Sequence, residues 1–169
     1  MIETVRSVSG AESLTQLIDR IDRILDRLLG QSGAACVLLT DVSGQLISAV
    51  GQTTRFEPGT VAALTASDMS ATAELARQLG EAKPFRILFH EGERHHLYLC
   101  SVGGSFILVV VFTSTVPIGL VRLFTERALG ELLKLAGQFE VALERVGGAF
   151  SETFEDSLND RLEDVFGSL

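Results

Sequence analysis

Basic residues are scarce in this chain. Its 169 residues include 14 Lys and Arg against 22 Asp and Glu, which gives a formal net charge of −8. Binding to nucleic acid or to an anionic membrane surface needs clustered Lys and Arg that release counterions. We therefore expect neither nucleic acid nor a membrane among the partners of this protein.

Cysteine is also rare, with only Cys36 and Cys100. Both lie in apolar, strand-like runs, where a free thiol behaves as a small hydrophobic side chain. Neither has a CxxC neighbour or another metal-ligand partner nearby, so buried thiols are favoured over a disulfide or a metal site. The N-terminus has no basic segment followed by an apolar one, as a secretory signal would have, which indicates the cytoplasm.

Motifs of known active sites are missing as well. No GxSxG nucleophile elbow surrounds a serine, and the glycines of residues 102–105 do not form a phosphate-binding GxxxxGK[ST] loop. His90, Glu93, His95 and His96 are close in sequence, but adjacent His95 and His96 would point to opposite faces of a strand. We expect no catalytic residue, no metal and no cofactor, and thus no enzyme.

The chain does have two strongly apolar runs within residues 96–112, joined at Gly103-Gly104. A glycine pair suits a tight hairpin turn, because both central residues can take a positive φ without a Cβ penalty. Neither face of the second run is polar, which predicts a central strand covered on both faces. Residues 97–121 carry no charge, so a membrane span is the alternative, although Ser, Gly, Thr and Pro cut them into strand-sized pieces.

The rest of the chain divides into helices and strands. After a loose lead-in, apolar positions at helical spacing predict a helix over residues 14–28, with Gly30 as its stop. A type I turn at residues 41–44 joins two strands. The strand at residues 85–90, placed at the edge of the sheet, would invite pairing with a second chain. Pro117 opens the last helix.

Small side chains mark the central helix, which begins near Glu57-Pro58 and ends at Gly80. We expect its core stripe to comprise Val61, Leu64, Leu75 and Leu79. Ala66, Ser70 and Ala73 form a second, flat stripe on which another helix could lie closely; a well-formed alanine-rich helix is the plainer interpretation.

The C-terminal segment beyond Gly147-Gly148 is acidic, yet apolar residues recur in it at spacings of three and four. It is too short to fold alone. Two interpretations stay open: an arm that orders against a partner groove, or a segment that docks on its own domain.

Taken together, the elements follow the order helix, two strands, helix, three strands, helix. In this order and in its alanine-rich central helix, the chain resembles the Roadblock superfamily of dynein light chain-like domains, and most closely the bacterial MglB family. The motifs that carry the resemblance span roughly residues 12–140, with a further one at the C-terminus: Asp41 with GQLISA at 44–49, GQT at 51–53, LTA at 64–66, LGE at 79–81, FHEG at 89–92 with Leu97-Tyr98, GLVRL at 119–123, and LEDVF at 162–166. Where the family commonly has Gly-Asn in the central helix, this chain has Ser67-Asp68.

The resemblance implies an α/β (α+β) fold, with a five-stranded antiparallel sheet, helices on both faces and the order αββαβββα. We expect three parts: an N-terminal lead-in (residues 1–11), a Roadblock-like domain (12–146) and an acidic amphipathic tail (147–169).

The resemblance also implies a function. It predicts a homodimer that binds a Ras-like small GTPase of the MglA type and acts as a GTPase-activating protein in cell polarity or gliding motility, with the tail assisting nucleotide exchange. The family repositions the catalytic residues of the GTPase and inserts no arginine finger. The alternative is a Roadblock scaffold that recruits partners without stimulating hydrolysis; a small-molecule sensor is a more distant one.

Two sets of residues follow from this resemblance. The GTPase-binding residues are expected on the central helix and on the tail: Ala62, Ala66, Ser67, Ser70, Ala73, Arg77, Leu158, Leu162, Val165 and Phe166. The dimer interface is expected on the edge strand and the same helix: Phe85, Ile87, Phe89, Ala63 and Ala71.

Overall fold

The computed structural model describes the backbone of residues 2–166 and the side chains of residues 14–139, 141, 142 and 144. Its elements, in chain order, are α1 (Ile2–Ser32), β1 (Cys36–Asp41), β2 (Leu46–Gly51), α2 (Pro58–Gln78), β3 (Ile87–Glu91), β4 (His95–Val102), β5 (Phe106–Thr113) and α3 (Ile118–Phe166). This is the predicted order αββαβββα, so the predicted fold class is confirmed.

Contacts divide the chain into two compact units. The first, which we call the globular unit, comprises Ile18–Ala136 and contains the whole sheet. The second comprises Met1–Leu17 and Gly137–Leu169, and its described backbone consists of the beginning of α1 and the end of α3. The boundaries of the predicted lead-in and tail remain predictions.

The sheet of the globular unit has five strands in the order β2-β1-β5-β4-β3, and all neighbours are antiparallel. The apolar strand β5 lies at its centre between β1 and β4, and its residues 106–112 are all buried. Strand β3 forms one edge, as the sequence predicts. Its outer backbone N–H and C=O groups therefore have no neighbouring strand in the sheet.

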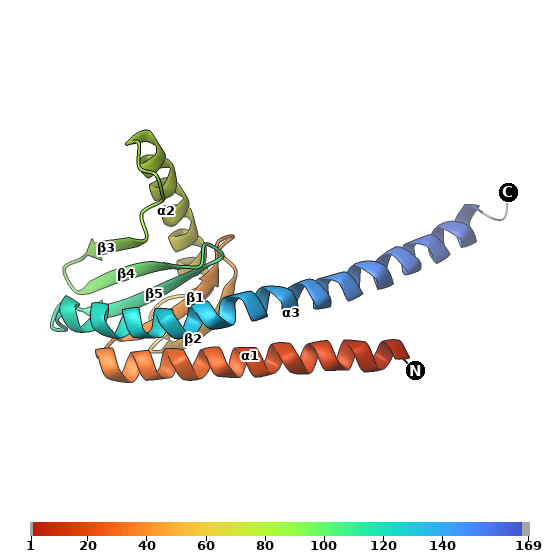
Figure 1. Cartoon of the computed structure of the whole chain (residues 1–169), viewed down its shortest axis with the longest axis horizontal. Coiled ribbons are helices and arrows are strands. Elements are labelled where there is room, and N and C mark those ends of the chain that lie inside the picture. The colour runs from red at the N-terminus through yellow and green to blue at the C-terminus, as the bar shows by residue number, and fades with distance from the viewer. Residues whose placement is uncertain (1, 167–169) are drawn as a thin grey trace. The chain divides into compact units, whose positions relative to one another are not determined.

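Helices cover both faces of the sheet (Figure 1): α2 lies on one face, and the parts of α1 and α3 that belong to the globular unit lie on the other. Alternation along β5 directs Ile107, Val109 and Val111 toward α2, where they form a core with Ala66. On the opposite face, Leu25 and Leu28 of α1 and Leu132 of α3 are among the buried residues, as the apolar stripe of the first helix predicts.

Glycines with positive φ make the two predicted hairpin turns. Gly103 and Gly104, with φ of 66° and 89°, begin the connection between β4 and β5. In the other turn, the Gly44 amide donates to the Asp41 carbonyl at 3.1 Å, and the Asp41 carboxylate accepts from the Ser43 and Gln45 amides at 2.9 and 2.8 Å. Both turns are confirmed.

The first helix differs from its prediction at both ends. It begins at Ile2, inside the segment predicted to be a loose lead-in, and it continues past Gly30 to Ser32. A glycine inside a helix costs only about 1 kcal/mol relative to alanine, so it need not end one. The helix ends before Gly33, which has a φ of 72° and thus takes the left-handed conformation common after a helix.

The uncharged stretch at residues 97–121 is divided between β4, β5 and the start of α3. Among the described residues, no helix is long and apolar enough to cross a membrane. Cys36 and Cys100 are both free and buried, as predicted. Burial raises the pKa of the Cys36 thiol to about 11, so this thiol stays protonated and unreactive at neutral pH.

Candidate functional site: the exposed face of α2 and the edge strand β3

Helix α2 is defined by strong signals at both ends. The Glu57 carboxylate accepts the Thr60 amide at its N-terminus, and hydrogen bonds from Thr60 and Gly59 lower the pKa of Glu57. At the other end, the amides of Gly80 and Glu81 donate to the carbonyls of Arg77 and Ala76 at 3.1 and 3.0 Å, which is a Schellman motif. The bounds predicted from the sequence are confirmed.

The side of α2 that faces the sheet is built from small residues. Its buried residues are Ala62, Thr65, Ala66 and Ala76. The helix lies so close to the β1–β2 turn that a Cβ on Gly44 would approach the Ala63 Cα to 2.8 Å. The small side chains thus allow a short distance between the helix backbone and the sheet.

The leucines of α2 and of its C-terminal cap point to solvent, whereas Val61 and Met69 pack against the core. Leu64, Leu75 and Leu79 are 65%, 53% and 66% exposed, so the prediction that they belong to the core stripe is wrong; only Val61 of that stripe packs against the core. The period of 3.6 residues identifies an apolar stripe but not the side that meets the sheet. Because alanines occupy the close contact, the leucines remain on the outer surface.

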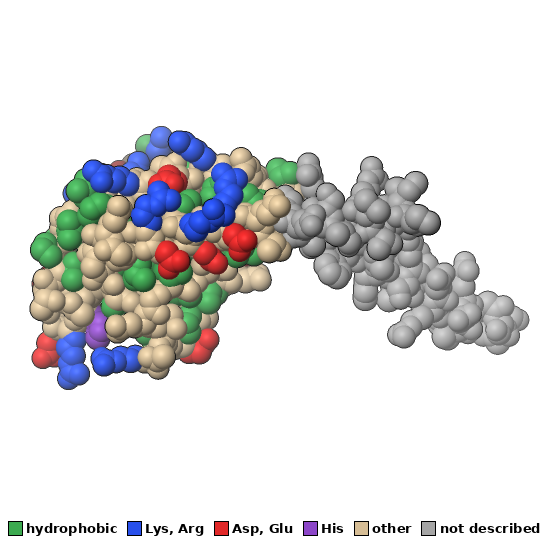
Figure 2. Space-filling view, turned by 90° about the horizontal axis from the view of Figure 1, so that it is seen from below, with side chains coloured by type: hydrophobic (Ala, Val, Ile, Leu, Met, Phe, Trp, Pro, Cys, Tyr) green, Lys and Arg blue, Asp and Glu red, His purple; other side chains and the backbone are tan. Residues whose placement is uncertain are grey.

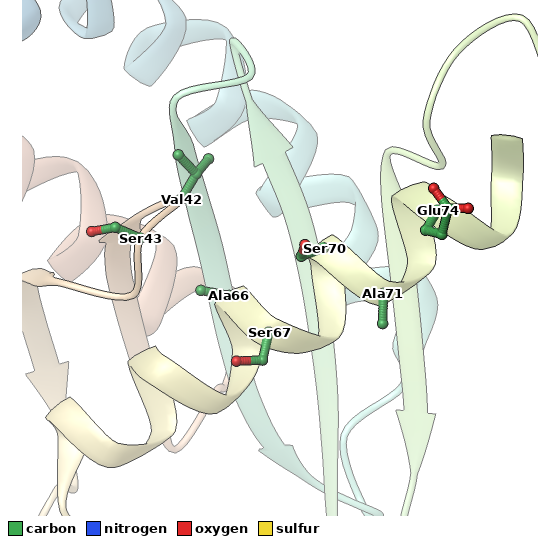
Figure 3. Close-up of a pocket in the computed structure, with 7 residues that line it drawn as sticks. All are labelled: Val42, Ser43, Ala66, Ser67, Ser70, Ala71 and Glu74. Atoms are coloured by element: carbon green, nitrogen blue, oxygen red, sulfur yellow. The ribbon is translucent and has the colours of Figure 1, made fainter.

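An open hollow of about 490 Å³ lies between α2 and the β1–β2 turn. Figure 3 shows Val42 and Ser43 on the turn, with α2 across from them. The α2 residues that line the hollow are Ala66, Ser67, Ser70, Ala71 and Glu74. Arg77 and Gln78 donate to the Glu74 carboxylate and lower the pKa of Glu74, so this carboxylate already has partners within its own helix.

Strand β3 adds a second apolar area at the edge of the sheet. Phe89 is 40% exposed, although its ring stacks on buried Phe112 with centroids 6.2 Å apart. Ile87 is half-buried, and so is Phe85, which precedes the strand. An edge strand with exposed apolar side chains is suited to pairing with another chain.

The predicted site residues are thus distributed over different environments. In the predicted dimer interface, Ala63 and Ala71 are exposed on α2, and Phe85, Ile87 and Phe89 lie at or next to β3. Of the predicted GTPase-binding residues on α2, Ser67, Ser70 and Arg77 are exposed, Ala73 is half-buried, and Ala62 and Ala66 are buried. The side chains of four predicted tail residues lie outside the described ones: Leu158, Leu162, Val165 and Phe166.

The structure also adds residues that the sequence interpretation missed. Leu64, Leu75 and Leu79 extend the exposed apolar face of α2, and Val42 lies beside it on the turn. The spacing of the three leucines was visible in the sequence. What was not visible is that alanines, rather than leucines, contact the sheet.

The opposite face of the globular unit has a different character. Figure 2 views the molecule from the side of α1 and α3 and shows basic and acidic side chains of both signs near one another. Arg27 of α1 pairs with Glu131 of α3 at 2.7 Å, and Arg122 pairs with Glu126 at 3.3 Å. This face therefore has no field of a single sign that would attract a polyanion.

Comparisons with known proteins agree on one family. The model of the Roadblock/LC7 domain matches residues 20–112. The solved MglB of Myxococcus xanthus is 38% identical, with 72% of this chain and 91% of that chain covered and a TM-score of 0.70.

Two further MglB structures are similar. Gliding protein MglB of Thermus thermophilus is 34% identical, with 72% of this chain and 92% of that chain covered and a TM-score of 0.66. An MglB in a tetrameric arrangement is also 34% identical, with 73% and 92% covered and a TM-score of 0.67. No curated protein sequence matches significantly. The chain therefore belongs to the Roadblock/LC7 family and, within it, is close to MglB.

Proposed function

We propose that this protein is a homodimeric regulator of a Ras-like small GTPase of the MglA type and that it accelerates GTP hydrolysis by that GTPase. The observation that carries the proposal is the similarity to MglB structures, which extends over nine-tenths of their length at 34–38% identity. The regulator has no active site of its own in this proposal; it would act on the catalytic residues of its partner.

Exposed apolar side chains on two separate elements support the dimer. Leu64, Leu75 and Leu79 are exposed on α2 and at its C-terminal end, and Phe89 is exposed on the edge strand β3, where the register with Tyr98 directs its side chain to the face opposite α2. Large exposed apolar areas on soluble proteins usually mark interaction sites. A second copy that adds its own β3 to the sheet edge would satisfy the free backbone groups and would place the two α2 helices on the same side. Phe85, Ile87, Ala63 and Ala71 would lie in this interface.

The GTPase would then contact the exposed small residues of α2 that remain accessible around the hollow. Ser67 and Ser70 lie there, with Arg77 further along the helix. Ala62 and Ala66 would support this surface from beneath, because both are buried against the sheet. Leu158, Leu162, Val165 and Phe166 of the tail would bind the GTPase elsewhere and assist nucleotide exchange, in cells where the pair controls polarity or gliding motility.

Single-turnover GTP hydrolysis by the cognate GTPase tests this function. We expect the rate to rise with added protein until it saturates. Ser70→Arg should abolish the stimulation and leave the dimer intact, because Ser70 is exposed; Ala66→Arg would instead disrupt the buried contact of α2 with the sheet. Ser114→Arg, at an exposed position in the β5–α3 loop, is the matched control and should retain full stimulation.

One outcome of the hydrolysis assay would contradict the proposal. Unchanged hydrolysis at saturating protein, together with binding that does not depend on the nucleotide, would contradict activation and support a scaffold.

For the tail, Leu162→Asp should slow release of a fluorescent GDP analogue from the GTPase while leaving stimulation of hydrolysis unchanged.

A further inference from the structure

On the face opposite α2, the helices α1 and α3 meet along a line that one ion pair marks. Arg27 of α1 pairs with Glu131 of α3 at 2.7 Å. Residues three, four and seven positions apart share one side of a helix. On both helices, the residues at these spacings from the ion pair are basic. We call the five basic side chains along this line, all of them exposed, the basic band: Arg20, Arg23, Arg27, Arg127 and Lys134.

Most acidic side chains of the two helices lie away from the basic band. Asp22 of α1 accepts a hydrogen bond from the Ser48 hydroxyl of the edge strand β2. Asp19 and Asp26 are three and four positions from Asp22 and share its side of α1. Figure 2 shows basic side chains gathered in the middle of this face, with most of the acidic ones in a row beside them. The face as a whole carries both signs, but the two signs are separated.

Apolar surface adjoins the basic band on α3. Leu120 is 39% exposed and lies seven positions before Arg127, on the same side of the helix. Phe124 is half-buried, and the Arg127 guanidinium lies 5.3 Å from the centroid of its ring. The aliphatic stems of the long basic side chains add further apolar surface. This surface therefore suits a helix that carries both carboxylates and apolar side chains.

The C-terminal segment of this chain has that chemistry. Residues 150–166 contain six acidic residues against one basic residue, Arg161. Their apolar residues recur at helical spacing: Phe154, Leu158, Leu162, Val165 and Phe166. The backbone of α3 is helical through Phe166. At 1.5 Å per residue, an unbroken helix carries this segment from about 24 Å to about 48 Å beyond Lys134. Its own basic band is then out of reach, whereas the band of a second copy is not.

We propose that the acidic C-terminal segment of one copy binds the basic band of a second copy, as a helix laid along the line between α1 and α3. The carboxylates pair with the basic side chains, and the apolar side chains cover Leu120 and Phe124. This inference goes beyond the proposed function, because it uses the face opposite α2 and needs no GTPase. A segment bound in this way is not available to a GTPase, so association of copies competes with its role in nucleotide exchange.

Fluorescence anisotropy of a labelled peptide of residues 148–169, titrated with the full-length protein, tests the basic band. We expect saturable binding that weakens with added salt. Arg23→Glu combined with Lys134→Glu, one change on each helix, should raise the dissociation constant about 5- to 30-fold, because each removes an exposed ion pair and adds a like-charge contact.

The matched control is Arg55→Glu combined with Arg94→Glu, which makes the same change in net charge at two exposed loop positions. It should change the dissociation constant of the peptide far less. Absence of binding, or an equal loss of affinity in both double variants, would overturn the proposal.

Sedimentation velocity of the full chain determines whose basic band the segment occupies. At protein concentrations above the dissociation constant of the peptide, the weight-average sedimentation coefficient should be lower for the band variant than for the wild type and the control. Equal coefficients, with peptide binding to the band retained, would place the segment on its own copy and contradict the proposal. Leu75→Ala, on the α2 face, should leave peptide binding unchanged, so failure of the proposed dimer remains distinguishable.

Discussion

Replacement of Leu75 by alanine is a direct test of the exposed face of α2. Leu75 is 53% exposed in the single chain, and the alanine keeps the helix because its helical propensity is the higher of the two. Complete burial of a leucine side chain contributes about 1.5–3 kcal/mol, so covering the exposed half contributes about 1 kcal/mol. A two-fold symmetric dimer buries this residue twice, which makes the total about 2 kcal/mol. We therefore expect the dissociation constant of the Leu75→Ala dimer to rise about 30-fold.

Sedimentation velocity over a concentration series measures this constant directly. Leu123→Ala is the matched control, since Leu123 is similarly exposed, at 46%, but lies on α3 on the opposite face of the sheet. It should leave the dimer unchanged. If Leu75→Ala dimerises as tightly as the wild type, or if both variants weaken equally, the α2 face is not the interface and the assignment of its leucines to a partner is refuted.

Three further predictions concern stability within a single chain. Thr125 is buried, and its hydroxyl has no hydrogen-bond partner in the described structure, so Thr125→Val should raise the free energy of unfolding by up to about 1 kcal/mol. Thr65→Val should lower the free energy of unfolding, because the Thr65 hydroxyl donates to the Ala62 carbonyl at 2.9 Å. Urea titrations compare the two. Gly130 lies inside a helix, and a Cβ there would meet no atom within 4 Å, so Gly130→Ala should stabilise the folded protein by about 1 kcal/mol. Gly44→Ala should destabilise it, because Gly44 has a φ of +92° and its Cβ would lie too close to the Ala63 backbone. The pKa of the Cys36 thiol is raised to about 11 in the folded state, whereas the same thiol ionises near pH 9 in the unfolded state. The free energy of unfolding should therefore fall between these pH values, by at most about 1.4 kcal/mol per pH unit. Cys36→Ser should flatten this slope.

The sheet could be predicted from the sequence because its signals are local. Gly103-Gly104 and Asp41 with Gly44 each determine a turn by backbone conformation alone, and strand alternation then determines which residues share a face. The first turn leads into a strand that is apolar on both faces, which placed β5 at the centre. These features depend on residues adjacent in the chain, so no knowledge of tertiary contacts was needed.

The orientation of α2 could not be predicted in the same way. Its stripe of Val61, Leu64, Leu75 and Leu79 and its stripe of alanines are both compatible with helical period, and choosing between them requires the distance from the helix to the sheet. That distance depends on Gly44, which is distant in sequence from the alanines it contacts. The start of α1 was missed for a related reason, because residues 2–11 have no clear apolar period.

The orientation of α2 has a consequence for function. A helix that serves only its own core places large apolar side chains inward and polar ones outward. Here the buried contacts of α2 are made largely by alanine, and its exposed leucines contribute nothing to the core of this chain. A partner that covered these leucines would bury apolar surface that the single chain leaves in water, and association would then gain the corresponding free energy.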